Sequence, residues 1–305
     1  MSDKLQVASH RRLSPVCVAV LLLMSYACQA QEDEAKWSLT PLIGVNSPSL
    51  SQINNNVFPA PVQWSGNIVV QPTGTPQTEV VTITNPLPKI QFATEGGIEL
   101  GYNFDSHDSL VLGYTTWEGS SSSTTRTVLP FQGIFSQVFY QRTGSFSYNS
   151  FSIGWRHKLY EDHRKWQLST QVGLKELYDI DYREDMVFLF QTGPAQSFKR
   201  IVSVNPQATG VTMLRLGLNG EYFPVQWLSI GLRGGYSVGF QDFSLNNATI
   251  KSDLQSNDNV GTILLPMRPG TDGKIQYLLQ DGSGYRNLKV SMDGWDVMLG
   301  ITLYH

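Results

Sequence analysis

The feature that most constrains the fold is an alternation of apolar with small or polar side chains over unusually long stretches. It is clearest near the C-terminus, where the apolar positions are Trp295, Val297, Leu299, Ile301 and Leu303. Glycine, aspartate, methionine and threonine stand between them, so an extended strand here has one apolar face and one polar or small face. Strands of soluble sheets usually run about five or six residues. The longer pattern favours an all-β chain that crosses a membrane with strands of ~9–11 residues.

Eight stretches follow this alternation, and the segments between them differ in length in a regular way. The predicted strands lie near 36–46, 91–104, 108–118, 146–158, 165–178, 210–223, 227–241 and 288–304. The short connections are 105–107, 159–164 and 224–226, and the long ones are 47–90, 119–145, 179–209 and 242–287. Short periplasmic turns and long extracellular loops alternate in this way in outer-membrane barrels. We therefore predict a closed antiparallel transmembrane β-barrel of eight strands, formed by residues 31–305 as one domain.

The pattern leaves two alternatives open. A soluble β-sandwich also has alternating strands, but glycine on the polar face suits the crowded interior of a small barrel better than an ordinary sheet. Residues 62–70 and 80–84 flank a turn sequence and predict a hairpin above the membrane, and 131–140 predicts a further strand. If these strands joined the wall, the barrel would have ten or twelve strands. The Ser/Thr-rich run 119–125 is expected to form a solvated loop tip.

The first thirty residues have the organisation of a secretory signal peptide. A basic segment ending at Arg12 precedes an apolar run over residues 16–24. The sequence Cys28-Gln29-Ala30 then supplies small residues before the cut, so we expect residues 1–30 to be removed after Ala30. A lipoprotein leader acylated at Cys28 is the alternative. Because Cys17 and Cys28 are the two cysteines of the chain, the exported protein would contain no disulfide.

Composition narrows the class of partner. Charged residues make up 15% of the chain and the formal net charge is −3, so there is no basic excess of the kind that binds nucleic acid. The histidines lack metal-ligand spacing, and the glycine-rich runs do not lead into a helix that would bind phosphate. We therefore expect no nucleic-acid partner, no metal and no cofactor.

The alternation resembles that of the small eight-stranded outer-membrane proteins of Gram-negative bacteria. This class includes the OmpA membrane domain, OmpW, OmpX and the opacity proteins. The likeness covers residues 31–305 and is most specific in the C-terminal strand, where His305 takes the place of the terminal aromatic residue that the barrel assembly machinery recognises. The resemblance implies an outer-membrane location, with membrane lipid, lipopolysaccharide and the assembly machinery as partners.

Charged residues on the polar face of the predicted strands would lie inside the barrel. They are Glu95, Glu99, Arg156, Lys158, Lys175, Arg215, Glu221, Arg233 and Asp296. Buried charge is costly unless it is paired, so we expect an ion-pair network across the interior. Such a network either packs the barrel or gates a narrow path through it. Packing is favoured, because side chains nearly fill an eight-stranded barrel.

Aromatic residues gather near the predicted strand ends. They are Trp37, Tyr102, Phe104, Trp155, Trp166, Tyr222, Phe223, Trp227 and Tyr304. Aromatic rings with a polar edge prefer the headgroup depth of a bilayer. We therefore predict an interfacial girdle rather than a sugar-binding platform.

No catalytic residues are predicted. The run from Asp105 to Ser109 contains Asp, Ser and His, but it lies in a short turn, where polar residues suit the turn and neighbours do not converge as nucleophile and base. The leading hypothesis is a non-enzymatic surface protein whose loops contact external ligands or other cells. The alternative is a porin-like passive channel for small solutes, which a wider barrel would favour. A lipid A-modifying or proteolytic barrel enzyme is the third hypothesis.

Overall fold

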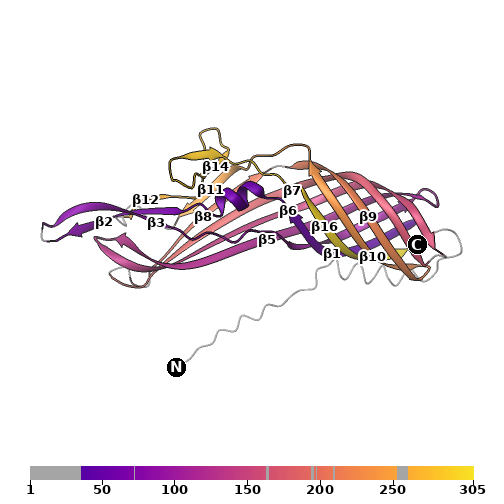
Figure 1. Cartoon of the computed structure of the whole chain (residues 1–305), viewed down its shortest axis with the longest axis horizontal. Helices are drawn as coiled ribbons and strands as arrows, with labels where there is room; N and C mark the ends of the chain where they lie inside the picture. The colour runs from indigo at the N-terminus through magenta and orange to yellow at the C-terminus, as the bar shows by residue number, and fades with distance from the viewer. Residues whose placement is uncertain are drawn as a thin grey trace, which may run out of the picture.

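Eight strands of the computed structural model close into an antiparallel ring (Figure 1). The structure describes residues 36–305 apart from 72, 163–164, 194–195, 197, 209 and 253–259, and the predicted signal peptide lies outside the described residues. In ring order the strands are β1 (Trp37–Pro48), β4 (Ala93–Asn103), β5 (Asp108–Phe131), β6 (Ile134–Asp162), β7 (Trp166–Phe190), β9 (Val211–Val225), β10 (Leu228–Gly239) and β16 (Gly294–Tyr304). Because β16 pairs with β1, the ring has no free edge. The predicted eight-stranded barrel is confirmed.

The two faces of each ring strand differ as the alternation requires. Outward side chains are apolar and exposed, and Ile43 and Leu299 show 62% and 57% of their surface. Inward side chains such as Glu99 and Arg233 are buried. A soluble sandwich would cover its apolar face with a second sheet, so that alternative is wrong. Among the described residues, no helix has both the length and the apolar character needed to cross a bilayer.

Strands β5, β6 and β7 continue far beyond the ring. With β8 (Lys199–Ala208) and β11 (Asn246–Ser252) they form a sheet in the order β5-β6-β7-β8-β11, which we call the sheet extension. The prediction of loops over 119–145 and 179–209 is therefore wrong. The run 119–125 is not a loop tip, because it pairs with residues 140–146 inside the β5–β6 hairpin. These residues remain strand because their inner face is buried under a second layer of chain.

The end of the β5–β6 hairpin explains why the ring is not wider. Gln132 and Gly133 have φ values of 51° and 87°, and Phe131 pairs with Ile134, as in a two-residue type I′ turn. Residues 131–140 are thus the tip of this hairpin and not a separate ring strand. The alternative of ten or twelve strands is not realised.

A bulge marks the boundary between the ring and the sheet extension. Asp179 on β7 has a φ of 49°, and the pairing of β7 with β6 shifts register between Ser147 and Asn149. Below the bulge β7 pairs with β9, and above it β7 pairs with β8. Bulges bend a strand and increase its twist, which suits the point where the wall opens from a barrel into a sheet.

The remaining elements cover the inner face of the sheet extension. The predicted hairpin is confirmed as β2 (Val62–Val70) and β3 (Thr75–Ile83), and β12 (Val260–Leu264) pairs with β2. A single π-helical turn, η2, spans Ile53–Val57. A small third sheet contains β13 (Met267–Pro269), β14 (Ile275–Leu278) and β15 (Tyr285–Asn287). Residues 288–293, predicted within the last strand, precede β16 and bury Leu288 and Val290 in this layer.

The hydrophobic core of the molecule lies between the sheet extension and this inner layer. Trp64 of β2 packs on Phe188 of β7 with ring centroids 5.0 Å apart, and Phe131 packs on Phe190 at 4.6 Å. All four side chains are almost completely buried. The long segments between ring strands therefore form a packed β-structure on one end of the barrel.

Candidate functional site

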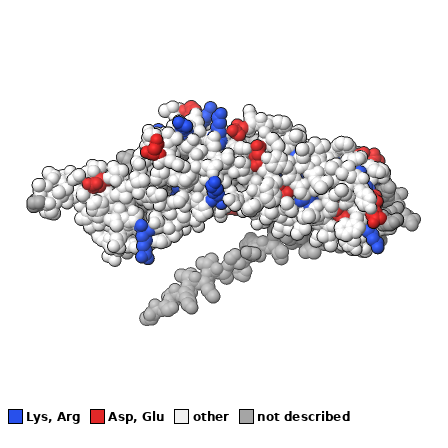
Figure 2. All heavy atoms as spheres, viewed as in Figure 1, with Lys and Arg blue, Asp and Glu red and all other residues white. Residues whose placement is uncertain are grey.

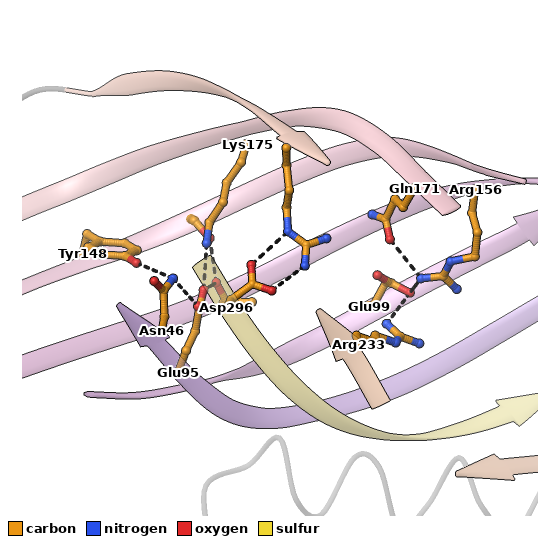
Figure 3. Close-up of polar contacts among 12 residues, drawn as sticks. Asn46, Glu95, Glu99, Tyr148, Arg156, Gln171, Lys175, Arg233 and Asp296 are labelled. Atoms are coloured by element: carbon orange, nitrogen blue, oxygen red, sulfur yellow. Dashed lines mark hydrogen bonds and ion pairs between the residues drawn. The ribbon is translucent and has the colours of Figure 1, made fainter. Parts of the chain in front are cut away.

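The interior of the barrel is organised around Glu99 of β4 (Figure 3). Arg156 of β6 donates to the Glu99 carboxylate at 2.5 Å, and Arg233 of β10 donates to the same oxygen at 2.6 Å. Arg156 also donates to Gln171 at 3.2 Å, and Arg233 donates to Thr40 at 3.2 Å. The Glu99 carboxylate therefore pairs with two guanidinium groups that come from strands on different sides of the ring.

A second cluster surrounds Glu95, nearer the sheet extension (Figure 3). Lys175 Nζ lies 2.9 Å from Glu95 Oε1, and Asn46 donates to Oε2 at 2.6 Å. The Thr115 hydroxyl donates to Oε1 as well. Tyr148 accepts from Asn46 at 3.1 Å and extends the network toward the core above the ring. A buried carboxylate with this many donors is satisfied in its ionised form.

The third pair joins Arg215 of β9 to Asp296 of β16 by two hydrogen bonds. Arg215 Nη2 lies 2.8 Å from Oδ2, and Nε lies 3.2 Å from Oδ1. Gly235 on β10 makes room for this pair, because a Cβ there would lie 2.7 Å from Arg215 Nη2 and 2.9 Å from Asp296 Oδ2. The glycine on the polar face therefore has a packing role that the alternation alone does not specify.

Glu221 lies at the end of the interior away from the sheet extension. Tyr304 donates to Glu221 Oε2 at 2.5 Å, Ser229 donates to the same oxygen at 3.2 Å, and Arg233 lies 3.6 Å from Oε1. Tyr304 was expected in the outer girdle, and that prediction is wrong. It alternates in phase with Asp296 on β16, so its side chain points inward.

Eight of the nine predicted interior charges meet in this network, and Lys158 does not. Lys158 lies near the end of β6, pairs with Glu161 at 2.8 Å and keeps 21% of its side chain exposed. Its side chain is on the same face of β6 as that of Arg156, but it lies nearer the end of the strand, where the ring no longer buries it. The buried set then contains four acidic and four basic side chains, so its formal charge is zero.

Paired charged side chains occupy the middle of the barrel interior. A cavity of about 30 Å³ remains between the Glu95 and Glu99 clusters, bordered also by Arg215, Asp296 and Met298. A space of this size holds about two water molecules. At the end toward the sheet extension, the aromatic rings of Trp117 and Tyr148 stack at 5.2 Å and are buried.

The outer surface of the ring carries the predicted aromatic residues at one end. Trp37, Phe104, Trp155, Trp166, Tyr222 and Trp227 are exposed and Tyr102 is partly exposed. Phe223 is an exception, because it alternates in phase with Glu221 and its ring lies 5.4 Å from that of Tyr304. The prediction that Phe223 faces lipid is therefore wrong.

A second aromatic group at the other end of the ring was not predicted. Phe92 and Trp295 pack at 5.4 Å, and Tyr236 is the register partner of Trp295. Tyr102 and Phe92 lie ten positions apart. At ~3.3 Å per residue and a tilt of roughly 40°, this separation corresponds to about 25 Å along the barrel axis, the height of the apolar band of an outer-membrane barrel.

A buried ion pair outside the ring was not predicted from the sequence. Arg142 Nε of β6 lies 2.7 Å from Glu184 Oε1 of β7, and both side chains are about 1% exposed. Tyr182 donates to the other Glu184 oxygen at 2.9 Å, and burial raises the pKa of this tyrosine well above its ordinary value. A signal was present, because most even-numbered positions from 138 to 148 and from 180 to 190 are apolar or aromatic, and Arg142 and Glu184 interrupt these two series.

Arg142 also holds the chain that follows β1. Its guanidinium donates to the carbonyl oxygens of Val57, Phe58 and Ala60 at 2.8, 3.1 and 2.8 Å. The carbonyls of Val57 and Phe58 also accept from backbone N–H groups, of Ala60 at 3.1 Å and of Leu87 at 3.0 Å, so the guanidinium is a second donor to both. The Arg142–Glu184 pair therefore fastens the inner layer to the sheet extension.

The turn between β4 and β5 contains the residues considered for catalysis. Asp105 accepts from the backbone N–H groups of His107 and Asp108 at 2.7 and 2.8 Å, which hold the pKa of this carboxyl below its usual value. Ser106 contacts His107 Nδ1 at 2.8 Å, whereas Asp108 pairs with His157. No carboxylate orients His107 in this arrangement. Within the described part of the chain, no group of three or more His, Cys, Asp or Glu side chains is placed to hold a metal ion.

The closed ring, its apolar outer surface and its polar interior define the outer-membrane β-barrel fold. No protein-family model matches the chain, and no curated protein matches it in sequence. Solved structures of this class do match it in fold over most of its length. CarO of Acinetobacter baumannii has 10% identity and a TM-score of 0.34, over 82% of this chain and 100% of that one.

Two further structures match at similar levels. The outer-membrane protease OmpT of Escherichia coli has 8% identity and a TM-score of 0.38, over 88% of this chain and 97% of that chain. The attachment invasion locus protein Ail of Yersinia pestis has 10% identity and a TM-score of 0.29, over 89% and 100%. The chain is similar to these proteins in fold class alone.

Proposed function

We propose that this protein is a non-conducting, non-enzymatic outer-membrane barrel of a Gram-negative bacterium that holds a rigid β-structure outside the cell for contact with partners. The observation that carries the proposal is the filled interior. Four acids and four bases neutralise one another there, and the cavity between the Glu95 and Glu99 clusters has a volume of about 30 Å³. A packed interior of this kind stabilises a small barrel and does not provide an aqueous path.

The outer surface supports the location. The apolar band and its two aromatic groups match the hydrocarbon and interfacial layers of an outer membrane, where the ring would contact lipid and lipopolysaccharide. Insertion would depend on the barrel assembly machinery, acting on the β16 strand. The short connections would then face the periplasm, and the sheet extension with its inner layer would face outward, where it would meet an external ligand.

Planar-bilayer conductance of refolded residues 31–305 tests the main claim. Folding is first checked by the mobility shift of heated against unheated protein on a gel. The folded protein is expected to show no open steps, and replacing Arg215 and Glu221 together is expected mainly to lower thermal stability. Reproducible steps from the folded wild type, altered by the same replacements, would overturn the proposal in favour of the channel.

Cysteine labelling tests the orientation separately. Thr75→Cys places a thiol at the start of β3, and Ser106→Cys places one in the turn between β4 and β5; both positions are exposed. A membrane-impermeant maleimide added to intact cells should label only the variant at Thr75. Labelling of the Ser106 variant alone would show that the barrel has the opposite orientation.

A further inference from the structure

The outward face of the sheet extension changes character along its length. Next to the ring it is polar, with the cross-strand pairs Ser120–Ser145 and Ser122–Thr143. On β7 the partners of Ser145 and Thr143 are Arg183 and Asp185, which form an ion pair. Beyond these pairs, toward the hairpin tip, the same face becomes apolar. The change is not required by the core, because the core is formed by the opposite face of these strands.

The apolar part, which we call the distal patch, is interrupted by Gln137, the register partner of Val128. It consists of Val128, Phe135, Phe139, Val187, Leu189 and Ile201. Phe139 is the register partner of Leu189, and Val187 is the partner of Ile201, so the patch spans β6, β7 and β8. Val128, Phe135 and Leu189 are 47%, 48% and 37% exposed. Single exposed apolar residues are ordinary, but a contiguous group of them marks an interaction surface.

The distal patch lies far from the membrane that would hold the ring. Phe151 is an exposed residue on the ring portion of β6, and Phe135 lies sixteen positions before it on the same strand. This separation is about 50 Å of strand at ~3.3 Å per residue. The lipid around the ring therefore cannot cover the patch.

Basic side chains outnumber acidic ones around the distal patch. Arg126 is the register partner of Phe139 and Lys199 is the partner of Leu189; both are exposed and share the outward face. The sequence contains no Asp or Glu from 119 to 160 or from 186 to 220. Asp185 lies on the same face, two residues before Val187, and its carboxylate pairs with Arg183 at 2.8 Å. Figure 2 shows few charged atoms at the end of the molecule remote from the ring. An apolar surface edged by cations is complementary to an anionic interface with apolar depth.

We propose that the distal patch docks onto an anionic lipid surface opposite the membrane that holds the barrel. The proposal rests on the proposed function, because it requires this end to lie outside the cell. Phe and aliphatic side chains would enter the headgroup boundary, while Arg126 and Lys199 contact lipid phosphates or carboxylates. A second copy of the chain suits the patch less well, because a symmetric pair would bring these cations together.

Vesicle flotation tests the proposal. Full-length mature protein in nanodiscs of phosphatidylcholine is mixed with vesicles of phosphatidylcholine that contain or lack phosphatidylserine. The protein is expected to float with the anionic vesicles and to be released by high salt. Phe135→Ser should weaken the association about tenfold or more, and Lys199→Gln about fivefold.

The matched control is Val80→Ser on β3, which removes an apolar side chain that is 60% exposed, against 48% for Phe135, from a different sheet. It should leave flotation unchanged. Equal binding to both vesicle types, or undiminished binding by the folded Phe135→Ser variant, would overturn the proposal. A wild type that forms pairs which Phe135→Ser separates, without floating, would assign the patch to a second copy instead.

The two proposals fail in different ways. If the Thr75→Cys variant is labelled on cells but the protein does not float, only the lipid proposal is wrong. If the protein conducts or is oriented inward, the proposed function is wrong whatever the vesicles show.

Discussion

Arg156 and Arg233 both donate to one oxygen of Glu99, at 2.5 and 2.6 Å, although they lie on β6 and β10, which are three positions apart in the eight-stranded ring. These two contacts, which we call the crossbrace, connect β4 with β6 and β10 through the interior of the barrel. Both arginines are buried, so removing the Glu99 carboxylate would leave two buried cations without a counter-charge. The loss of stability on its removal therefore measures the contribution of Glu99.

Glu99→Gln should lower the free energy of unfolding by about 3 kcal/mol, because it leaves two buried guanidinium groups without their carboxylate. Urea unfolding in detergent, followed by tryptophan fluorescence, measures the change. Glu161→Gln is the matched control, since it removes a carboxylate from the partly exposed Lys158 pair and should cost below about 1 kcal/mol. Equal effects of the two changes would contradict the crossbrace.

Gly235→Ala should destabilise the folded barrel, because the new Cβ meets both partners of the Arg215–Asp296 pair within 3 Å. The neighbouring change Gly234→Ala is the control, since a Cβ there has no atom within 4 Å. The temperature at which each variant loses its heat-modifiable gel mobility compares them. If both glycines tolerate alanine equally, Gly235 does not make room for the ion pair.

Arg142→Met should release the inner layer without opening the ring. The substitution leaves Glu184 buried without its cation, and it removes the guanidinium donor from the carbonyls of Val57, Phe58 and Ala60. Limited proteolysis should then cut within residues 49–60, while the heat-modifiable mobility of the barrel persists.

The double change R142M/E184M provides the check on Arg142→Met. It removes the buried unpaired carboxylate as well, so it should be less destabilised than R142M alone, although the three carbonyls still lack the guanidinium donor. If the double change is as unstable as the single one, the ion pair itself contributes little and the carbonyl contacts dominate.

The turn between β4 and β5 should lose stability in acid. Backbone N–H groups hold the folded pKa of Asp105 below its ordinary value of 3.8. Its stabilising contribution is therefore complete above that value and disappears as the pH falls through the folded pKa. The difference in unfolding midpoint between wild type and Asp105→Ala should be constant from pH 7 to about pH 5 and should shrink below about pH 4. A difference that grows in acid would contradict this assignment.

The ring and its filling were largely readable from the sequence. Period-two alternation identified all eight ring strands, and the same alternation placed Glu95, Glu99 and six further charges inside. It failed at the strand ends. Tyr304 and Phe223 alternate with the interior, but their aromatic character suggested the lipid interface, and Lys158 lies just past the point where the ring excludes water.

The sheet extension was not predicted as strands from the sequence. Residues 119–145 and 179–209 alternate as the ring strands do, but next to the ring their outward face is polar instead of apolar, with serines on β5 and the Arg183–Asp185 pair on β7. This polar face is typical of solvated loops. Their buried face has no partner within its own strands. It is covered by η2, β2, β3 and the segments after β11, which come from distant parts of the chain.

The sequence alone therefore determined that the chain forms a closed β-barrel with a charged interior, because strand facing depends only on a local repeat of two residues. The tertiary structure decided which charges pair, where Gly235 is required, and that Arg142 fastens a packed layer above the ring. Those features depend on strand register and on contacts between segments more than eighty residues apart, such as Arg142 with Val57, and no local pattern encodes them.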